Sequence, residues 1–154
     1  MTPINLASIK LKKILLVEED PHDAELTLAA LEENQMASQV AIVRDSMEAL
    51  DYLYRRGQYS SRPPGDPVLV LLDSKMPKAG SLRVLKTIKV DEQLKSIPVV
   101  ALTSLRETSD MVEFYKHGVI AYVVKPVDFS QFVKTIKQLG LSSAAGNEPL
   151  FVGP

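Results

Sequence analysis

Five short apolar runs, none of which contains a charged residue, alternate along the chain with segments of helical periodicity. The runs are ILLV at 14–17, VAIV at 40–43, VLVLL at 68–72, PVVAL at 98–102 and IAYVV at 120–124. Continuous apolar runs rich in β-branched residues are typical of strands covered on both faces, as in a parallel sheet. The alternation therefore predicts a strand followed by a helix, five times over.

The segments between the runs repeat apolar residues at helical spacing, so each predicted helix has one face for the core. These faces comprise Ala24, Leu28 and Leu31; Met47, Leu50 and Tyr54; Leu82, Leu85 and Ile88; Met111 and Tyr115; and Phe129, Phe132, Val133 and Ile136. Helix starts are marked by residues that favour the N-cap, and Pro21 follows one of them at the first helical position. The predicted caps are Asp20, Ser46, Ser81 and Asp128.

Right-handed crossovers between parallel strands place helices on both faces of the sheet. We therefore predict an α/β fold with a doubly wound, five-stranded parallel sheet of flavodoxin-like order 2-1-3-4-5, whose sites lie at the carboxyl ends of the strands. The expected organisation is an N-terminal extension at 1–11, one domain at 12–140 and a C-terminal tail at 141–154. The Pro- and Gly-rich segment 55–67 reads as a solvated loop, and the tail as a mobile segment with an apolar tip.

Composition excludes several classes of function. A net charge of -1 over 154 residues gives no reason to expect a nucleic-acid partner, because that binding depends on basic charge. The absence of cysteine excludes disulfides, thiolate metal sites and cysteine nucleophiles. Neither a secretory leader nor an apolar stretch long enough for a membrane span is found, so we expect a cytoplasmic protein without membrane contact.

Chemically useful side chains follow the apolar runs. Glu18-Glu19-Asp20 follow the first run, Asp73 the third, Thr103 the fourth and Lys125 the fifth. Because carboxyl ends of parallel strands share one edge, these groups should converge there. Clustered carboxylates are ligands for Mg²⁺, an aspartate can attack phosphorus, and lysine and threonine can bind phosphoryl oxygens.

Each of these residues alone has a simpler interpretation. A single Asp at a strand end is most often a turn or cap residue, acidic residues favour a helix N-terminus, and a lone lysine is usually solvated. Their occurrence together at strand ends of the same polarity favours a phosphoryl-transfer site.

At these residues the sequence resembles the receiver domains of two-component response regulators. The stretches ILLVEEDP, VLLDSKMPKAG, VVALTS and AYVVKP match that family's acidic pair, phosphoacceptor loop, hydroxyl-bearing strand end and Lys-Pro. The resemblance implies that Asp73 accepts a phosphoryl group from a sensor histidine kinase. It further implies that Mg²⁺ is held by Glu19, Asp73 and the backbone carbonyl of Lys75, with Glu18 supporting the site.

The resemblance also implies a switch. Thr103 and Tyr122 would change position together after phosphorylation and alter the face formed by the fourth helix, fifth strand and fifth helix. Phosphoryl transfer and hydrolysis would be self-catalysed rather than the turnover of an enzyme, and output would be protein binding or phosphate relay. The stretch YLYRRGQY and the sequence of 97–128 are similar to those of single-domain regulators partnered with phytochrome-type kinases. This similarity implies a homodimer through the face of the fourth helix, fifth strand and fifth helix.

Two departures from the family pattern keep a second interpretation open. Glu19 stands where such regulators usually have Asp, and its carboxylate reaches about 1.5 Å farther, which leaves Asp20 as a substitute ligand. Gly80-Ser81 replaces the usual Asp-Gly of the loop. The alternative is a degenerate receiver that acts without phosphorylation as a protein-binding or dimerisation module.

Two other classes fit less well. An aspartate-nucleophile phosphatase needs a second Asp where this chain has Lys75. A flavin or nucleotide binder needs a phosphate-cradling loop after the first strand, where this chain carries acidic residues.

Overall fold

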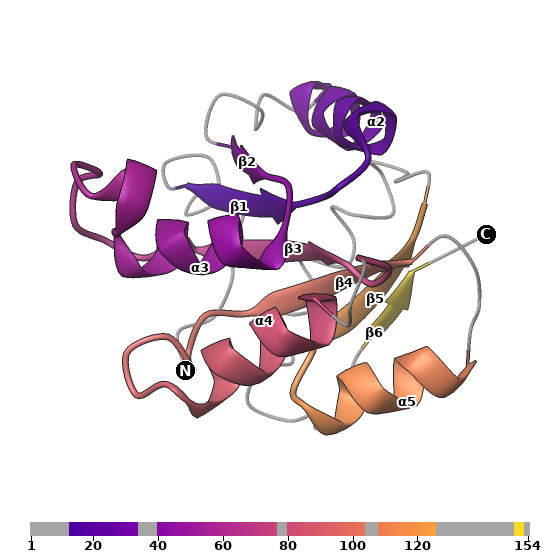
Figure 1. Cartoon of the computed structure of the whole chain (residues 1–154). Helices are drawn as coiled ribbons and strands as arrows, with labels where there is room; N and C mark the ends of the chain where they lie inside the picture. Colours follow the sequence, from indigo (N-terminus) through magenta and orange to yellow (C-terminus); the bar gives the residue numbers. More distant parts are fainter. Residues whose placement is uncertain (1–12, 34–39, 77–79, 104–107, 126–149, 153–154) are drawn as a thin grey trace.

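Strands and helices alternate to form a parallel sheet with helices on both faces (Figure 1). This computed structural model describes residues 13–33, 40–76, 80–103, 108–125 and 150–152. In chain order the elements are β1 (Ile14–Val17), α2 (Pro21–Glu32), β2 (Val40–Val43), α3 (Ser46–Tyr54), the 3-10 helix η2 (Gly57–Tyr59), β3 (Leu69–Asp73), α4 (Gly80–Val90), β4 (Val99–Thr103), α5 (Thr108–Lys116), β5 (Ala121–Val124) and β6 (Leu150–Val152).

The strands lie in the order β2-β1-β3-β4-β5-β6, and every neighbouring pair is parallel. The predicted doubly wound sheet of order 2-1-3-4-5 is therefore confirmed for the first five strands. The order in which successive strands are added reverses at β1, because β2 lies on one side of it and β3 on the other. In such sheets the carboxyl ends beside the reversal form the usual site, here the ends of β1 and β3.

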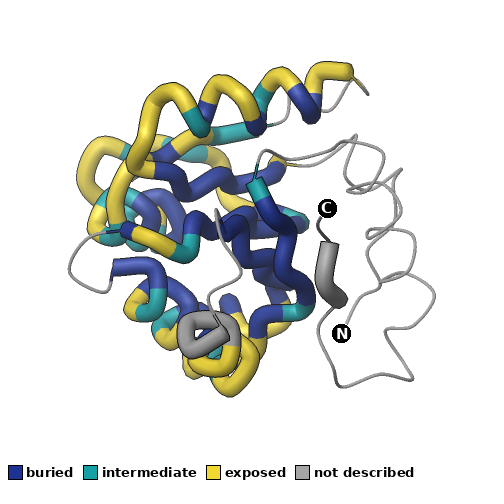
Figure 2. Tube along the Cα trace, turned by 90° about the vertical axis from the view of Figure 1, so that its right-hand side faces the viewer, coloured by how far each residue is buried: buried dark blue, intermediate teal, exposed yellow. Residues whose placement is uncertain are grey.

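The continuous apolar runs of β1, β3, β4 and β5 are explained by burial on both faces of the sheet (Figure 2), whereas the edge strand β2 is only partly buried. In β1, Leu15 and Val17 join the core under α3, α4 and α5, while Ile14 and Leu16 join a second core that includes Leu31 of α2. All four side chains of β1 are fully buried. Successive residues of a strand point to opposite faces, so a strand between two helix layers needs apolar residues at every position.

The starts of α2 and α3 follow the capping rules, and the cap of α3 lies one residue before the predicted position. Asp20 caps α2 and accepts hydrogen bonds of 2.8 and 3.2 Å from two backbone N–H groups, and Pro21 occupies the first turn, as predicted. The cap of α3 is Asp45, one residue before the predicted Ser46, which is the first helical residue. The side chain of Asp45 accepts a hydrogen bond of 2.7 Å from the N–H of Glu48. The carboxylate of Asp45 reaches the third helical N–H and so replaces the expected hydroxyl.

Segment 55–67, expected to be a solvated loop, is attached to α3. The ring of Tyr59 packs edge-on against Tyr52 at 5.1 Å, and its hydroxyl donates 2.6 Å to Glu48. The guanidinium of Arg62 lies 4.3 Å from the centre of the Tyr52 ring, a distance at which a cation–π contact forms. The Arg62 side chain also donates a hydrogen bond of 3.0 Å to the Tyr52 carbonyl. Aromatic packing and charge-assisted bonds therefore hold this loop in place, which its Pro and Gly content did not indicate.

The C-terminal tail contributes a strand that the sequence did not predict. Residues Leu150–Val152 form β6, which pairs in parallel with β5 at the edge of the sheet. The expected fifth helix, with Asp128 as its cap, lies outside the described residues. Within the described part of the chain, no helix is long and apolar enough to cross a membrane.

Candidate functional site

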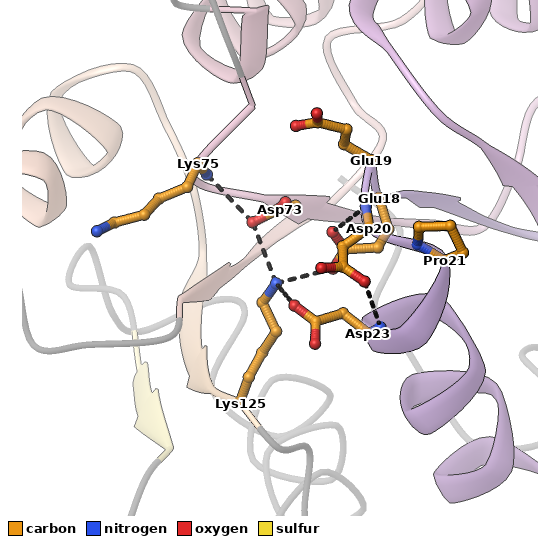
Figure 3. A pocket seen from close by; sticks show the side chains of 8 residues that line it. All are labelled: Glu18, Glu19, Asp20, Pro21, Asp23, Asp73, Lys75 and Lys125. Carbon is orange, nitrogen blue, oxygen red and sulfur yellow. Dashed lines mark hydrogen bonds and ion pairs between the residues drawn. The ribbon is translucent and has the colours of Figure 1, made fainter.

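The carboxyl ends of the central strands form an open acidic pocket of about 350 Å³ (Figure 3). Strand register explains the convergence: Val17, just before Glu18, pairs with Leu72, and Asp73 pairs with Leu102 of β4. Next to them, the N–H of Lys125 donates 2.7 Å to the Thr103 carbonyl and extends the β4–β5 pairing by one step. The pocket is lined by Glu18, Glu19, Asp20, Pro21, Asp23, Asp73, Lys75 and Lys125.

Lys125 is the centre of this cluster. Its Nζ atom lies 2.8 Å from Oε1 of Glu18, 2.9 Å from Oδ2 of Asp23 and 3.3 Å from Oδ1 of Asp73. Two donors of the ammonium group form hydrogen bonds here, to Glu18 and Asp23, and Asp73 lies beside it as an ion-pair partner. The three acids come from β1, α2 and β3, so one cation joins four elements of the fold.

The carboxylates outnumber the cations in the pocket, and the titration of Glu18 reflects this. Its side chain is fully buried. Burial and the nearby Asp73 carboxylate raise the pKa of Glu18 to about 7, against the opposing effect of Lys125. Burial also opposes the charge on Lys125, but its hydrogen bonds to Glu18 and Asp23 outweigh burial and hold the pKa of Lys125 above its ordinary value. The site thus keeps its ammonium charged and remains short of positive charge.

Asp73 is contacted by groups of the loop and helix that follow it, in addition to Lys125 in the pocket. The residue is 5% exposed, and its Oδ1 accepts 3.1 Å from the N–H of Lys75. The hydroxyl of Ser81 donates to the Asp73 carbonyl and accepts 3.1 Å from the N–H of Met76. Ser81, expected to cap a helix, is instead the second residue of α4, where its buried hydroxyl ties the helix to the loop after Asp73.

The two remaining acids of the Glu18–Asp20 run are placed differently from the buried Glu18. Glu19 is exposed, and Figure 3 shows its carboxylate directed away from Lys125. The carboxylate of Asp20, considered as a substitute metal ligand, already accepts the two N–H groups at the start of α2. Among the described side chains no group of three or more acids or histidines is arranged to hold a metal ion. In this arrangement the Lys125 ammonium occupies the point on which three carboxylates converge.

The comparison with known families decides the class. Residues 14–137 match the response regulator receiver domain. The chain belongs to this family. The resemblance predicted from the strand-end motifs is therefore confirmed.

Similar proteins include several regulators named for phytochromes. The structure of the bacteriophytochrome response regulator AtBRR is 55% identical, covers 89% of this receiver and 98% of its own chain, and has a TM-score of 0.76. The phosphorylated cyanobacterial phytochrome response regulator RcpA is 37% identical, with coverage of 87% and 96% and a TM-score of 0.69. Response regulator Rcp1 of Synechocystis sp. is 33% identical over 82% of this chain and 84% of its own. The predicted likeness to phytochrome-associated regulators is confirmed.

The two residues predicted to switch lie on neighbouring strands of the receiver. Thr103 ends β4 and is 4% exposed, but it is not among the described residues that line the acidic pocket. Tyr122 of β5 is 6% exposed, and burial raises its pKa to about 12, while a hydrogen bond with the Tyr115 backbone acts in the opposite direction. Tyr122 therefore points its ring into the core under α5, next to a helix that leaves Val112 and Tyr115 partly exposed.

Sequence reasoning missed one acid of the receiver site. Asp23 lies on the first turn of α2, three residues after its cap, and pairs with Lys125. The signal was present in the sequence, because a carboxylate in the first turn of the first helix lies beside the carboxyl end of the first strand.

Proposed function

We propose that this receiver accepts a phosphoryl group on Asp73 from the phosphohistidine of a sensor kinase. The observation that carries the proposal is the setting of the Asp73 carboxylate, which is buried, opens on an acidic pocket and has the Lys125 ammonium 3.3 Å away. A buried carboxylate is costly unless it is paired, and here its partner is a cation suited to phosphoryl oxygens.

In the proposed step, a carboxylate oxygen of Asp73 forms a bond to phosphorus while the bond from phosphorus to the histidine nitrogen breaks. The electron pair of the broken bond goes to the imidazole, and an acyl phosphate remains on the receiver. Lys125 would then pair with one phosphoryl oxygen and Thr103 would donate a hydrogen bond to another. The N–H of Lys75, already 3.1 Å from Oδ1, holds the attacking carboxylate in a fixed orientation.

The donor set of the pocket fits a magnesium ion. It offers carboxylate oxygens, which are hard ligands, and burial together with the nearby Asp73 carboxylate raises the pKa of Glu18. We propose Glu18, Glu19, Asp73 and the backbone carbonyl of Lys75 as the residues that would hold Mg²⁺. When bound, the ion supplies positive charge that lowers the repulsion between an anionic nucleophile and an anionic phosphoryl group.

The kinase is proposed to be of phytochrome type, by analogy with the regulators AtBRR and RcpA. Phosphorylation adds roughly one to two negative charges beside Lys125, which would shift Thr103 and Tyr122 and with them the surface near α5. Because that surface leaves Val112 and Tyr115 partly exposed, we propose it as the contact with a second copy of the chain or a downstream protein.

A second candidate function is favoured by the position of Glu19. Its carboxylate is directed away from Lys125, and no described group of side chains is arranged as a metal site. A receiver with this arrangement could bind partners without phosphorylation. The two candidates differ in one measurable property, which is whether Asp73 becomes phosphorylated.

The test is incubation with acetyl phosphate, with and without Mg²⁺, followed by intact mass. We expect a Mg²⁺-dependent gain of one phosphoryl group that is absent in Asp73→Asn and retained in Asp66→Asn, a matched change at an exposed loop residue. No gain under conditions that phosphorylate another receiver would exclude the self-catalysed mechanism. Restoration by Glu19→Asp would then assign the fault to the metal site, and no restoration would favour the phosphorylation-independent module.

A further inference from the structure

We infer that Asp23 is a positioning residue that fixes the Lys125 ammonium for phosphoryl transfer. The inference rests on the proposed function of Asp73 and adds a residue to that site. The Asp23 to Lys125 distance of 2.9 Å is shorter than the 3.3 Å between Lys125 and Asp73. Lys125 is thus held by its neighbours at least as firmly as by the residue on which it would act.

Two anchors from different elements explain how the ammonium is held. Glu18 approaches from the end of β1 and is fully buried, whereas Asp23 approaches from the first turn of α2 and is 33% exposed. Lysine has a long, flexible stem, so a single ion pair leaves its charged group free to move about that partner. A second carboxylate on another element restricts this movement and keeps the ammonium beside Asp73, with one of its three donors not used by either anchor.

The backbone fixes Asp23 independently of Lys125. Its N–H donates 3.2 Å to the capping carboxylate of Asp20, so its position in the helix is set by the cap. A negative charge at this position is also favoured by the positive end of the helix dipole. The cap therefore keeps Asp23 in place when the contents of the pocket change.

The consequence for the reaction follows from the three donors. When Asp73 carries a phosphoryl group, the donor that neither anchor uses pairs with a phosphoryl oxygen, while the other two keep their bonds to Glu18 and Asp23. Without the Asp23 carboxylate, one donor turns to solvent and the ammonium is less often in the productive position. We therefore expect slower phosphorylation, with no change in the Mg²⁺ concentration that gives half the maximal rate.

The test compares rates of phosphorylation by acetyl phosphate at saturating Mg²⁺. Asp23→Asn keeps the size of the side chain and removes its charge, and the expected loss is about five-fold, the effect of one charge-assisted hydrogen bond near the surface. Asp23→Glu should recover part of the rate. The matched control is Glu25→Gln, which removes a charge from an exposed position of the same helix and should leave the rate unchanged.

Removal of any nearby negative charge also favours the approach of an anionic phosphodonor, an effect opposite in direction to the one expected. A rate for Asp23→Asn equal to or above that of the parent protein would therefore overturn the inference. So would equal losses in Asp23→Asn and Glu25→Gln, because that result would indicate a general effect of charge. A raised Mg²⁺ requirement would overturn it too, since Asp23 would then act through the metal and not through Lys125.

A second measurement does not depend on phosphorylation. We expect Asp23→Asn to lower the midpoint of thermal unfolding in the parent protein but not in a Lys125→Gln background, where the ammonium is absent. Equal changes in both backgrounds would show that Asp23 does not act through Lys125. If the parent protein is not phosphorylated at all, the proposed function fails, while this comparison still decides whether the two residues are coupled.

Discussion

Lys89 provides a test of the electrostatics away from the site. It lies in the last turn of α4, half-buried, and its Nζ donates 2.7 Å to the Ile97 carbonyl and 3.2 Å to the Lys95 carbonyl. Neither partner carries a charge. Burial therefore lowers the pKa of Lys89 from 10.5 to about 8.

The sign of the effect on stability follows from proton counting. Below pH 8 Lys89 is charged in both the folded and the unfolded chain, so its destabilising effect is complete and constant. Between pH 8 and 10.5 the unfolded chain holds a proton that the folded chain lacks, and the free energy of unfolding rises with pH. The full difference in pKa corresponds to about 3 kcal/mol, and solvent screening of a half-buried group reduces it to about 1–2 kcal/mol.

The assay is denaturant unfolding of the parent protein and of Lys89→Met at a series of pH values across that window. The free energy of unfolding of the parent, relative to Lys89→Met, should rise by about 1–2 kcal/mol from neutral pH to about pH 10.5. Lys86→Met, a matched change at an exposed lysine of the same helix, should show no such dependence. A difference that is flat or falls with pH would refute the reasoning, because it would mean that the carbonyls compensate fully for burial of the charge.

Three further changes test the fold and the site. Gly118→Ala should lower the free energy of unfolding by about 1–2 kcal/mol in a denaturant titration, because Gly118 has a φ of +97° that disfavours a side chain. Tyr59→Phe should cost about 1 kcal/mol in the same measurement and speed amide exchange in segment 55–67, because it removes the hydrogen bond to Glu48. Asp73→Asn, without Mg²⁺, should raise the free energy of unfolding by about 1 kcal/mol, because it relieves repulsion with Glu18.

Each expectation has an outcome that contradicts it. A Gly118→Ala protein as stable as its parent would show that the backbone there relaxes easily. Unchanged exchange in Tyr59→Phe would mean that ring packing on Tyr52, and not the hydroxyl, holds the loop. A less stable Asp73→Asn protein would mean that the ion pair with Lys125 outweighs the repulsion among the carboxylates.

The parallel sheet could be predicted because every position of a strand buried on both faces favours an apolar residue. A run such as 14–17 has no polar position, and only a strand between two helix layers requires that. Convergence of Glu18, Asp73 and Lys125 then follows from topology, since parallel strands end at one edge. These predictions depend on the backbone and on the identity of residues at strand ends.

The features that were missed depend on side-chain geometry and on contacts distant in sequence. Attachment of segment 55–67 requires that Tyr59 reach Tyr52 and Glu48, and its composition alone indicates only a turn-rich loop. Pairing of β6 with β5 joins the tail to the sheet edge, and three apolar residues are too short a signal for a strand. Helix geometry places Asp23 beside the end of β1, but its contact with Lys125 depends on a side-chain rotamer, and so does the outward direction of Glu19.

The acidic cluster contains repulsion among carboxylates that packing alone would not produce. Glu18, Asp23 and Asp73 share one ammonium, so acidic groups outnumber the cation three to one, and the innermost of them, Glu18, is fully buried. A fold selected only for stability would replace one of the buried acids by an amide and lose the repulsion. Retention of the excess makes sense if the site must attract a cation and then pass its lysine to a phosphoryl group. On this view the repulsion that lowers stability at Asp73 and the chemical function of Asp73 have the same cause. That cause is negative charge in excess of the ammonium, held at the end of a rigid strand.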